Sequence, residues 1–435
     1  MLVEEERKRQ RRGNRAFAVS IVFSALFLAS CSTAVAPSVS PAYKFENGNW
    51  YNGNSFEKVE VYTIDGTLSR RRPQAIDDVI DLNDGYVIPA FGDAHSHRPS
   101  SVDRALDDNE FFLASGIFYV MNHGSLAKYY AGMVEKLEVD GRIDATFANA
   151  ILSSSQSHSV ELWQRLVNRG AFPDTTLDNL DGEAYFIIET AEDLERRWPE
   201  ILASRLDFIK IMLQHSDEYP IRRNEKKYFG HSGLDPMLVP EIVKRAHAEG
   251  LRVSAHIESA SDFRAAVASG VDIIAHLPGY DVAMDDDIAR YRLSADDAAI
   301  AAENDVIVLT TTLLSVDRAE SEPARLQRML RNHAENLSLL SDAGVRLGIG
   351  SDQFSKNSID ELLNLASLGV FDNGMLLKLI CCITPRAIFP NREVGSLADG
   401  AEASFLVLDG NPLDAIENIT KIRMRVKDGV LLPSQ

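Results

Sequence analysis

The sequence predicts an α/β protein whose main part is a (β/α)8 TIM barrel, accompanied by a small β-sandwich domain formed by both chain ends. The first observation behind this prediction is a central region in which eight short apolar runs alternate with helical patterns. The second is a pair of terminal regions in which short β-prone runs are separated by Gly, Asn and Asp. Apolar runs are typical of parallel strands buried on both faces, and their repeated alternation with helices is typical of a barrel.

The eight apolar runs give the expected barrel strands. They lie at residues 86–91, 117–121, 145–151, 208–212, 252–255, 271–275, 306–311 and 345–349. Gly250, Gly270 and Gly344 each end a helical pattern just before the next strand. A long open α/β sheet is the alternative. We favour the closed barrel because the candidate ligand residues recur on the first, fourth, fifth, sixth and eighth strands, which only a ring brings together.

The chain divides into four expected regions. Residues 1–30 form a lipoprotein signal peptide, and residues 31–43 form a tether rich in Ser, Ala and Pro. Residues 86–393 form the barrel, whereas residues 44–85 and 394–435 form a composite β-domain. The two ends can build one domain because chain termini often lie close together.

The N-terminal region has the pattern of an export signal. A basic start is followed by an apolar run at Ala16–Ser30, which is shorter than the ~20 residues of a bilayer span but fits a signal-peptide core. The run ends in Leu-Ala-Ser-Cys31, which resembles a bacterial lipobox. The resemblance implies a lipid anchor on Cys31 in the bacterial periplasm, at the outer membrane because Ser32 is not the Asp linked to inner-membrane retention. A plain signal peptide cleaved near an incidental Cys31 is the alternative.

The composition is that of an ordinary globular protein. Of the 435 residues, 45% are hydrophobic and 25% are charged, and the formal net charge is -19. So acidic a chain is not suited to nucleic acid, whose phosphates attract Lys and Arg. A small-molecule substrate is expected, and a homo-oligomer is compatible with the sequence. Cys381 and Cys382 are neighbours on an expected helix, where a bridge between them would be strained, so no disulfide is expected.

The histidines are distributed unevenly between strands and helices. Of the ten, only His247 and His333 fall in expected helices, whereas the other eight lie at or just past the ends of expected strands. The carboxyl ends of the strands form the active-site face of a barrel. His95 and His97 end the first strand with one residue between them, so both imidazoles can point the same way. Four later strands carry further ligand types, namely Lys210, His256, His276 and Asp352.

Several segments resemble the amidohydrolase superfamily. Val87-Ile-Pro-Ala-Phe-Gly-Asp-Ala-His-Ser-His97 is similar to the superfamily's P-G-x-x-D-x-H-x-H, with Ala90 in place of Gly. Asp207-Phe-Ile-Lys-Ile211 is similar to the D-x-I-K-I of the prolidase-like and imidazolonepropionase-like subgroup. The resemblance covers most of residues 44–435. It includes the closing segment Gly395-Ser-Leu-Ala-Asp-Gly-Ala-Glu-Ala-Ser-Phe-Leu-Val-Leu-Asp409, in which Ser404 stands where the superfamily usually has Asp.

The resemblance implies a binuclear metal site. It assigns His95, His97 and Asp352 to one metal, His256 and His276 to the other, and a carboxylated Lys210 to the bridge between them. Two divalent metal ions, with zinc favoured, would share a hydroxide that attacks a carbonyl, while Asp352 takes the proton and passes it to the leaving amine. Glu258 stands one place too early for the H-x-x-E of mononuclear deaminase-like members, which favours the binuclear type. An ordinary buried lysine paired with an acid is the alternative for Lys210.

Substrate contacts are expected from the loops that follow the strands. The candidates are His123, His158, Tyr228, His231, Arg290 and Arg292. Either arginine could pair with a substrate carboxylate, which favours a dipeptide or an N-acyl amino acid. The expected reaction is hydrolysis of an amide C–N bond. A lactone, ester or phosphotriester hydrolase with the same site is the first alternative, and a periplasmic binding lipoprotein without catalysis is the second.

Overall fold

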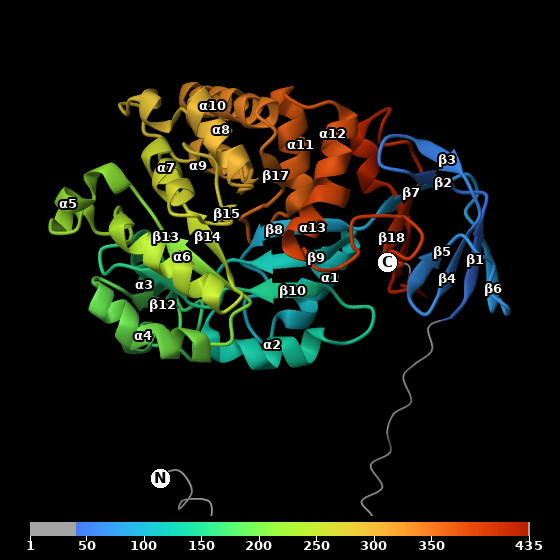
Figure 1. Cartoon of the computed structure of the whole chain (residues 1–435), viewed down its shortest axis with the longest axis horizontal. Coiled ribbons are helices and arrows are strands. Elements are labelled where there is room, and N and C mark those ends of the chain that lie inside the picture. The colour runs from blue at the N-terminus through green and yellow to red at the C-terminus, as the bar shows by residue number, and fades with distance from the viewer. Residues whose placement is uncertain (1–40, 434–435) are drawn as a thin grey trace, which may run out of the picture. The chain divides into compact units, whose positions relative to one another are not determined.

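The computed structural model describes residues 41–433 (Figure 1). The expected signal peptide and the lipobox with Cys31 lie outside the described residues, as does most of the expected tether. Within residues 41–433, no helix combines the length and the apolar character that crossing a bilayer requires.

The described part of the chain contains a closed barrel of parallel strands. Its strands are β8 (Phe91–Ser96), β9 (Ile117–Asn122), β10 (Asp144–Phe147) continued by β11 (Ile151–Ser153), β13 (Phe208–Met212), β14 (Arg252–His256), β15 (Ile273–Ile274), β16 (Ile307–Leu309) and β17 (Arg346–Gly348). The third strand is broken in the middle, because β10 pairs with β9 whereas β11 pairs with β13. A short extra strand, β12 (Tyr185–Ile187), also pairs with β11. The ring closes where the Ala94 amide donates to the Ile349 carbonyl at 2.9 Å.

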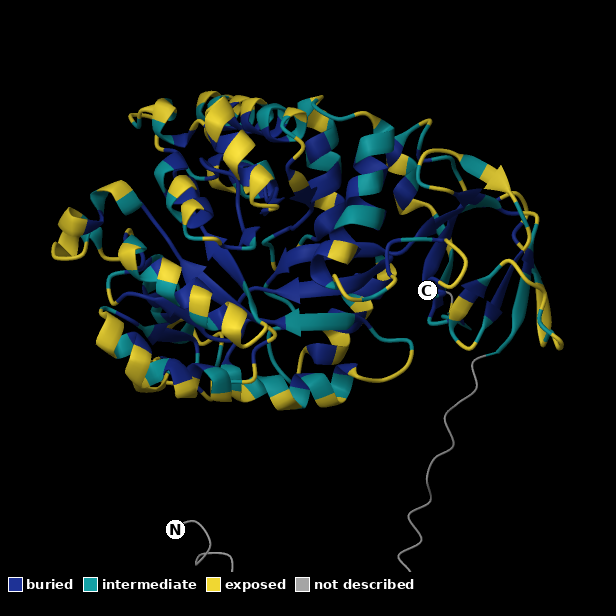
Figure 2. Ribbon diagram, viewed as in Figure 1, coloured by how far each residue is buried: buried dark blue, intermediate teal, exposed yellow. Residues whose placement is uncertain are grey.

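Helices surround the barrel and expose their polar faces (Figure 2). They are α1 (Ala105–Ala114), α2 (Tyr130–Leu137), α3 (His158–Asn168), α4 (Ala191–Ala203), α5 (Tyr219–Arg222), α6 (Val239–Ala248), α7 (Ala260–Ala268), α8 (Ala295–Glu303), α9 (Leu313–Ala319), α10 (Pro323–Asp342), α11 (Ser358–Leu368), α12 (Asn373–Lys378) and α13 (Thr384–Ile388). Capping boxes begin α4, α7, α8 and α11, so the local sequence fixes where these helices start. Gly250, Gly270 and Gly344 follow α6, α7 and α10 with positive φ, which confirms the expected helix ends.

Both ends of the described chain build one β-sandwich, as predicted. One sheet has the order β5-β4-β1-β6 and the other has the order β20-β19-β18-β7-β2-β3. Their strands are β1 (Tyr43–Glu46), β2 (Asn49–Tyr51), β3 (Phe56–Lys58), β4 (Val61–Ile64), β5 (Thr67–Ser69), β6 (Asp78–Asp81), β7 (Tyr86–Pro89), β18 (Phe405–Leu408), β19 (Ile422–Lys427) and β20 (Val430–Leu431). The Phe405 ring lies 5.2 Å from the ring centroids of both Phe45 and Trp50, so residues from both ends share one core.

The first barrel strand differs from the expected one. The run at 86–91 was expected to open the barrel, but β7 belongs to the sandwich, where it pairs with β18 and β2. The barrel begins at Phe91, one residue after Ala90. Val87 and Ile88 are fully buried in the sandwich, and a strand buried on both faces has the same apolar sequence in either environment. The apolar pattern therefore could not place this domain boundary.

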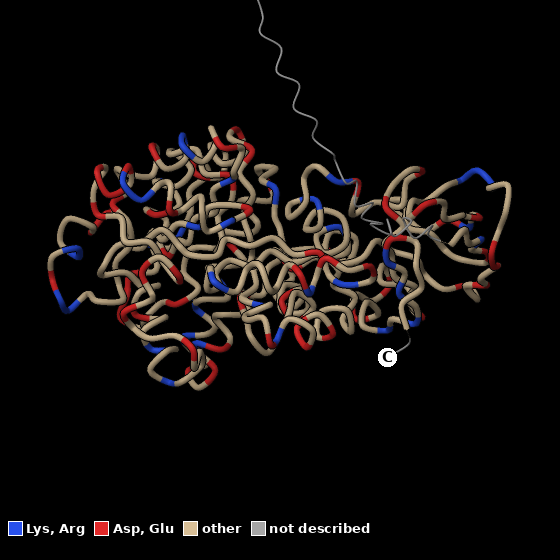
Figure 3. The backbone as a smooth tube through the Cα atoms, turned by 90° about the horizontal axis from the view of Figure 1, so that it is seen from below, with Lys and Arg blue, Asp and Glu red and all other residues tan. Residues whose placement is uncertain are grey.

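Acidic and basic side chains are mixed over the described chain (Figure 3). Many of them form ion pairs on the surface, such as Arg196 with Asp193 and Lys58 with Asp84. Exposed pairs of this kind contribute at most about 1 kcal/mol each. The fold therefore depends mainly on its apolar core, which runs continuously through the barrel and the sandwich.

Gly350 allows the last and first barrel strands to approach each other. A Cβ atom at this position would lie 2.5 Å from the His95 Cβ and 2.8 Å from the His95 backbone nitrogen. We expect Gly350→Ala to lower the free energy of unfolding by about 1–3 kcal/mol through overpacking. Urea denaturation measures this change. Gly374→Ala is the matched control because its nearest neighbours are 3.4 and 4.0 Å away and its helix, α12, tolerates Ala. Equal stability of the two variants would contradict the proposed constraint.

Candidate metal centre and substrate cavity

Four of the expected ligand residues meet at the carboxyl end of the barrel. One possible ligand atom from each of His95, His276 and Asp352 lies within 4.8 Å of the others, which is the geometry of a metal site. An oxygen of Asp352 also lies 3.0 Å from His97 Nε2 and 3.6 Å from His95 Nε2. Although burial opposes its ionisation, the histidines and Lys210 hold the pKa of Asp352 well below its usual range. The carboxylate is therefore ionised and faces the imidazoles.

Backbone and hydroxyl groups orient the imidazoles of this cluster. His95 Nδ1 lies 3.0 Å from the Ala275 carbonyl, and His97 Nδ1 lies 3.3 Å from the Gly124 carbonyl. A carbonyl accepts only from a protonated nitrogen, so the neutral His95 ring keeps its Nε2 lone pair directed at the Asp352 side. His276 Nδ1 lies 3.0 Å from the Thr311 hydroxyl. Burial holds the pKa of His95 and of His276 well below the usual value, so both rings are neutral.

Two residues at this end of the barrel have strained backbones. Asp352 has φ 49° and Thr311 has φ 42°, both in the left-handed region that residues with a Cβ seldom adopt. The Asp352 amide donates to the His95 carbonyl at 2.7 Å, which holds the turn against the first strand. Strain of this kind is kept where the surrounding structure determines the position of a side chain, and it concentrates at functional sites.

Lys210 lies on β13 with its side chain buried. Its Nζ is 3.1 Å from His123 Nδ1, and no carboxylate forms an ion pair with it among residues 41–433. Burial lowers the pKa of Lys210 to about 7, because the apolar surroundings disfavour the ammonium ion. An unpaired lysine at this depth is costly unless another group compensates its charge.

His256 ends β14, the strand that pairs with the strand of this lysine, β13. Its ring is 4.6 Å from that of His276, and its Nε2 is 3.3 Å from the Tyr280 hydroxyl. The same hydroxyl donates to Glu258 at 3.1 Å. Burial opposes the ionisation of Glu258, but His215 and His256 hold its pKa well below the usual range. An ionised carboxylate therefore lies beside His256, with an oxygen 3.8 Å from its Nε2.

Asp93 connects the first strand to the segment after the last strand. Its carboxylate accepts hydrogen bonds from the Ser351 amide at 3.0 Å, the Ser351 hydroxyl at 2.7 Å and the Ser358 amide at 3.1 Å. It also accepts from the His95 amide at 3.2 Å. Burial raises its pKa to about 6 despite these donors. Asp93 thus holds the backbone on both sides of the contact between His95 and Asp352. The sequence alone did not indicate this role.

A cavity of about 300 Å³ opens over the metal ligands. One wall is apolar and comes largely from α3, whose residues 159, 162, 163 and 166 follow helical spacing toward the cavity. The apolar lining consists of Ile151, Leu162, Trp163, Leu166, Phe172, Met212, Leu314 and Phe354. Phe354 also stacks on His97 with ring centroids 5.8 Å apart. The cavity therefore offers an apolar surface immediately beside the reacting position.

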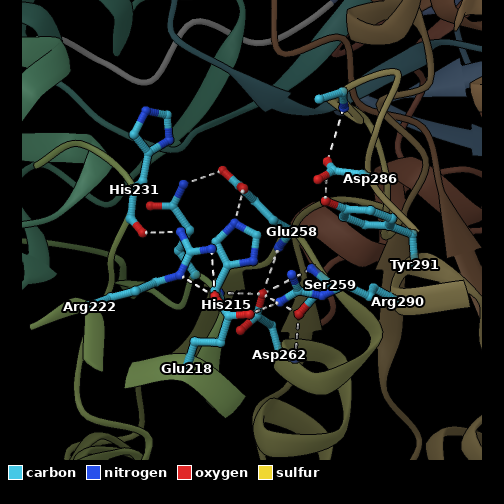
Figure 4. Close-up of polar contacts among 12 residues, drawn as sticks. His215, Glu218, Arg222, His231, Glu258, Ser259, Asp262, Asp286, Arg290 and Tyr291 are labelled. Atoms are coloured by element: carbon cyan, nitrogen blue, oxygen red, sulfur yellow. Dashed lines mark hydrogen bonds and ion pairs between the residues drawn. The ribbon is translucent and has the colours of Figure 1, made fainter. Parts of the chain in front are cut away.

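A second, polar cavity of about 490 Å³ lies beyond the first. Its lining includes Arg222, Arg290, His215 and Glu258, and Figure 4 shows their polar contacts. His158, Tyr280 and Arg318 line both cavities. The two cavities thus meet beside His256, whose ring stacks on that of His158 at a centroid distance of 6.0 Å.

The expected substrate contacts fall into three groups. His158 lies between the two cavities, and His231 and Arg290 line the polar one. His123 lines the metal cavity but is fully buried, with Nε2 at 2.9 Å from the Ala94 carbonyl and Nδ1 facing Lys210. It is therefore placed to support Lys210 and stacks on His95 at 3.9 Å.

Tyr228 and Arg292 form the third group, which lines neither cavity. The Tyr228 ring packs against the guanidinium of Arg222 at 4.7 Å. Arg292 is half exposed and forms an ion pair with Glu335 at 2.8 Å. Sequence position after a strand brought both residues into consideration, but the loops turn them away from the site.

Sequence reasoning missed Tyr280, Trp163 and Arg318. Tyr280 follows His276 by four residues, and its closeness in the chain was an available signal. Trp163 and Arg318 lie on helices, and no local pattern distinguishes a helix face that lines a cavity from one that packs on a core. Their roles depend on the path of the loops that precede α3 and α9.

Comparisons with known proteins agree with the fold. Residues 86–432 match the description "Amidohydrolase family". An ochratoxinase from A. niger has 15% identity, 91% of this chain and 96% of that chain covered, and a TM-score of 0.72. A prolidase complexed with N-methylphosphonate-L-proline has 19% identity, 91% and 100% coverage, and a TM-score of 0.68. A putative prolidase from Bifidobacterium longum has 16% identity, 91% and 97% coverage, and a TM-score of 0.67. A comparison with curated proteins found no match.

The match over 86–432 spans most of the chain, and the site has the donors of a metal-dependent hydrolase. The chain belongs to the amidohydrolase family. It is a metal-dependent enzyme that hydrolyses C–N bonds, with a possible metal site at His95, His276 and Asp352. The solved structures share the fold at low identity, so they leave the substrate open.

Glu361 ties the start of α9 to the barrel and makes stability depend on pH. Its carboxylate accepts from the Thr312 amide at 2.9 Å and the Leu313 amide at 2.7 Å, and burial raises its pKa to about 7. Because the pKa of Glu361 is raised in the folded state, this group stabilises the folded protein fully below the unfolded pKa of 4.5. The stabilisation is lost as the pH rises through 7.

We expect the wild-type free energy of unfolding to fall between pH 4.5 and about pH 7, by up to about 1.4 kcal/mol per pH unit from this group. Glu361→Gln should flatten that fall, because the amide does not titrate. Denaturation at several pH values measures the slope, with the exposed Glu303→Gln as control. An unchanged slope in Glu361→Gln would contradict the assignment.

Proposed function

We propose that the protein is a binuclear metal-dependent hydrolase that cleaves an amide bond of a dipeptide or an N-acyl amino acid. The observation that carries the proposal is the convergence of His95, Asp352, His276 and His256 around one cavity. The same cavity contains the amine of Lys210, which contacts His123 and forms no ion pair with a carboxylate of the described residues. A catalytic site needs donors with free lone pairs beside an accessible space, and both are present here.

The donor set fits two divalent ions. His95, His97 and Asp352 would hold one ion, and His256 with His276 would hold the other. Lys210 would bridge them after carboxylation, in which its neutral amine attacks carbon dioxide, forms an N–C bond and releases a proton. The carbamate exchanges a costly buried cation for an anion with two oxygens. Nitrogen and oxygen donors of this kind suit zinc, which we favour, and also manganese. When bound, such ions polarise a carbonyl and acidify water.

The side chains around the cavity would then handle the proton. Asp352 is ionised and lies 14% exposed at the cavity, so it can accept a proton from the attacking water and deliver it to the leaving amine. Tyr280 donates to Glu258, and this hydrogen bond fixes its hydroxyl beside His256. His123 would orient Lys210 through the contact of its Nδ1 with the lysine Nζ.

The first experiment is metal analysis of purified residues 32–435 prepared without chelator. We expect two divalent ions per chain and, after growth with ¹³C-bicarbonate, a carbamate resonance on Lys210. Lys210→Met should hold fewer than two ions, and Asp352→Asn should lower kcat by about 10²–10⁴-fold. His247→Gln is the control, because His247 is half exposed and bonds to Asp272 away from the site.

One ion per chain with an unmodified Lys210 would contradict the binuclear proposal. A panel of amides, lactones, esters and phosphotriesters decides between the proposed reaction and its alternatives. Turnover restricted to lactones, esters or phosphotriesters would reassign the bond that is cleaved. A fully metal-loaded protein with no turnover would favour a binding function.

We also propose a lipid anchor on Cys31 and a periplasmic location, which rest on the sequence pattern alone. Cys31→Ser should move the protein from the membrane fraction to the soluble fraction and abolish labelling by a radioactive fatty acid. Cell fractionation with the wild-type protein as reference measures both effects. Fatty-acid labelling that persists in the variant, or that is absent from the wild-type protein, would exclude this anchor.

A further inference from the structure

The metal cavity and the polar cavity are neighbours whose linings share His158, Tyr280 and Arg318. We call them the apolar half and the polar half of the proposed substrate site. The half beside α3 is lined by apolar side chains, whereas the half beyond Tyr280 is lined by charged ones. The boundary between them lies next to His256. A substrate with its scissile bond at the metal ligands would therefore extend into both environments.

Resting on the proposed amide hydrolysis, we propose that the substrate is an N-acyl amino acid with a bulky apolar acyl group and a free carboxylate, and that Arg318 binds this carboxylate. The acyl group lies along α3 in the apolar half. The amino acid is the leaving group and extends toward the polar half.

The apolar half is large enough and rigid enough for an aromatic or long aliphatic acyl group. Trp163 is 5% exposed and packs on Phe172 with ring centroids 5.2 Å apart, so its position is fixed by the core behind it. Leu162 and Leu166 continue the same face of α3. Burial of an apolar group against this surface stabilises the complex in proportion to the area removed from water, whereas an acetyl group would leave most of the surface unfilled.

The arginines of the polar half differ in how far their charges are already used. Arg222 and Arg290 both form ion pairs with the carboxylate of Glu218, at nitrogen–oxygen distances of 2.6 and 2.9 Å. Figure 4 shows these three side chains close to His215. Arg325 binds Asp281 at 2.5 Å. Arg318 approaches the same Asp281 only at 3.8 Å, with 43% of its side chain exposed.

Arg318 is also the only arginine that lines both cavities among the described residues. It lies on α9, one helical turn after Leu314, which lines the apolar half. The backbone carbonyl of Arg318 accepts a hydrogen bond from Arg325 Nη1 at 3.1 Å, and this bond fixes the position of the Arg318 backbone. A guanidinium in this position can bind a carboxylate through two parallel hydrogen bonds. The expected contacts Arg290 and Arg292 are already paired with Glu218 and Glu335.

The test compares N-(phenylacetyl) amino acids with the same compounds whose carboxylate is blocked as a primary amide. We expect the metal-loaded wild-type enzyme to prefer the free acid by at least tenfold in kcat/KM. Arg318→Gln should remove this preference mainly by raising KM for the free acid, with little effect on the blocked compound. Arg318→Lys should restore part of it. The exposed Arg331→Gln is the control, and equal melting temperatures exclude a folding defect.

An Arg318→Gln enzyme that keeps the preference for the free acid would overturn the role of Arg318 while leaving amide hydrolysis intact. Equal rates for acetyl and phenylacetyl substrates would overturn the assignment of the apolar half. Preferred cleavage of N-succinyl arylamines would reverse the orientation. Absence of turnover on every amide, with turnover of lactones, would instead defeat the proposed function and the inference that rests on it.

Discussion

The contact between the first and last barrel strands is the constraint on which the site depends. His95 and Asp352 come from positions 257 residues apart in the chain, yet the Asp352 amide donates to the His95 carbonyl. Asp93 reinforces this contact by binding amides on both sides of it. The absence of a side chain at Gly350 permits the approach. The metal ligands are therefore brought together by barrel closure itself, and their spacing follows the spacing of the strands.

The sequence predicted the barrel and the composite sandwich because both depend on repeated patterns. Apolar runs, helix-ending glycines and histidines after strands are local signals that survive in the folded protein. Lys210 was recognisable because one cationic residue interrupts a buried strand. The boundary at Ala90 was not predictable, since β7 and a barrel strand are buried to the same degree. An apolar sequence pattern indicates that a strand is buried, but it does not indicate which neighbouring strand or sheet buries it.

The substrate cavity was less predictable than the metal ligands for a related reason. Strand residues have directions set by the alternation of the backbone, so His95 and His97 could be placed from spacing alone. Tyr228, Arg292 and Arg318 lie beyond loops whose path depends on many weak contacts. The sequence favoured arginines after the sixth strand, whereas the structure places Arg318, after the seventh, between the two cavities.

Helix α3 combines two tasks on one rigid element. Its first residue, His158, stacks on His256, and its following turns present Leu162, Trp163 and Leu166 to the cavity. The expected ligands themselves lie at the ends of barrel strands or just after them, and this face of the helix does not determine their positions. Evolution can therefore alter the surface of the cavity by exchanging three side chains on two successive turns, without disturbing the reactive centre.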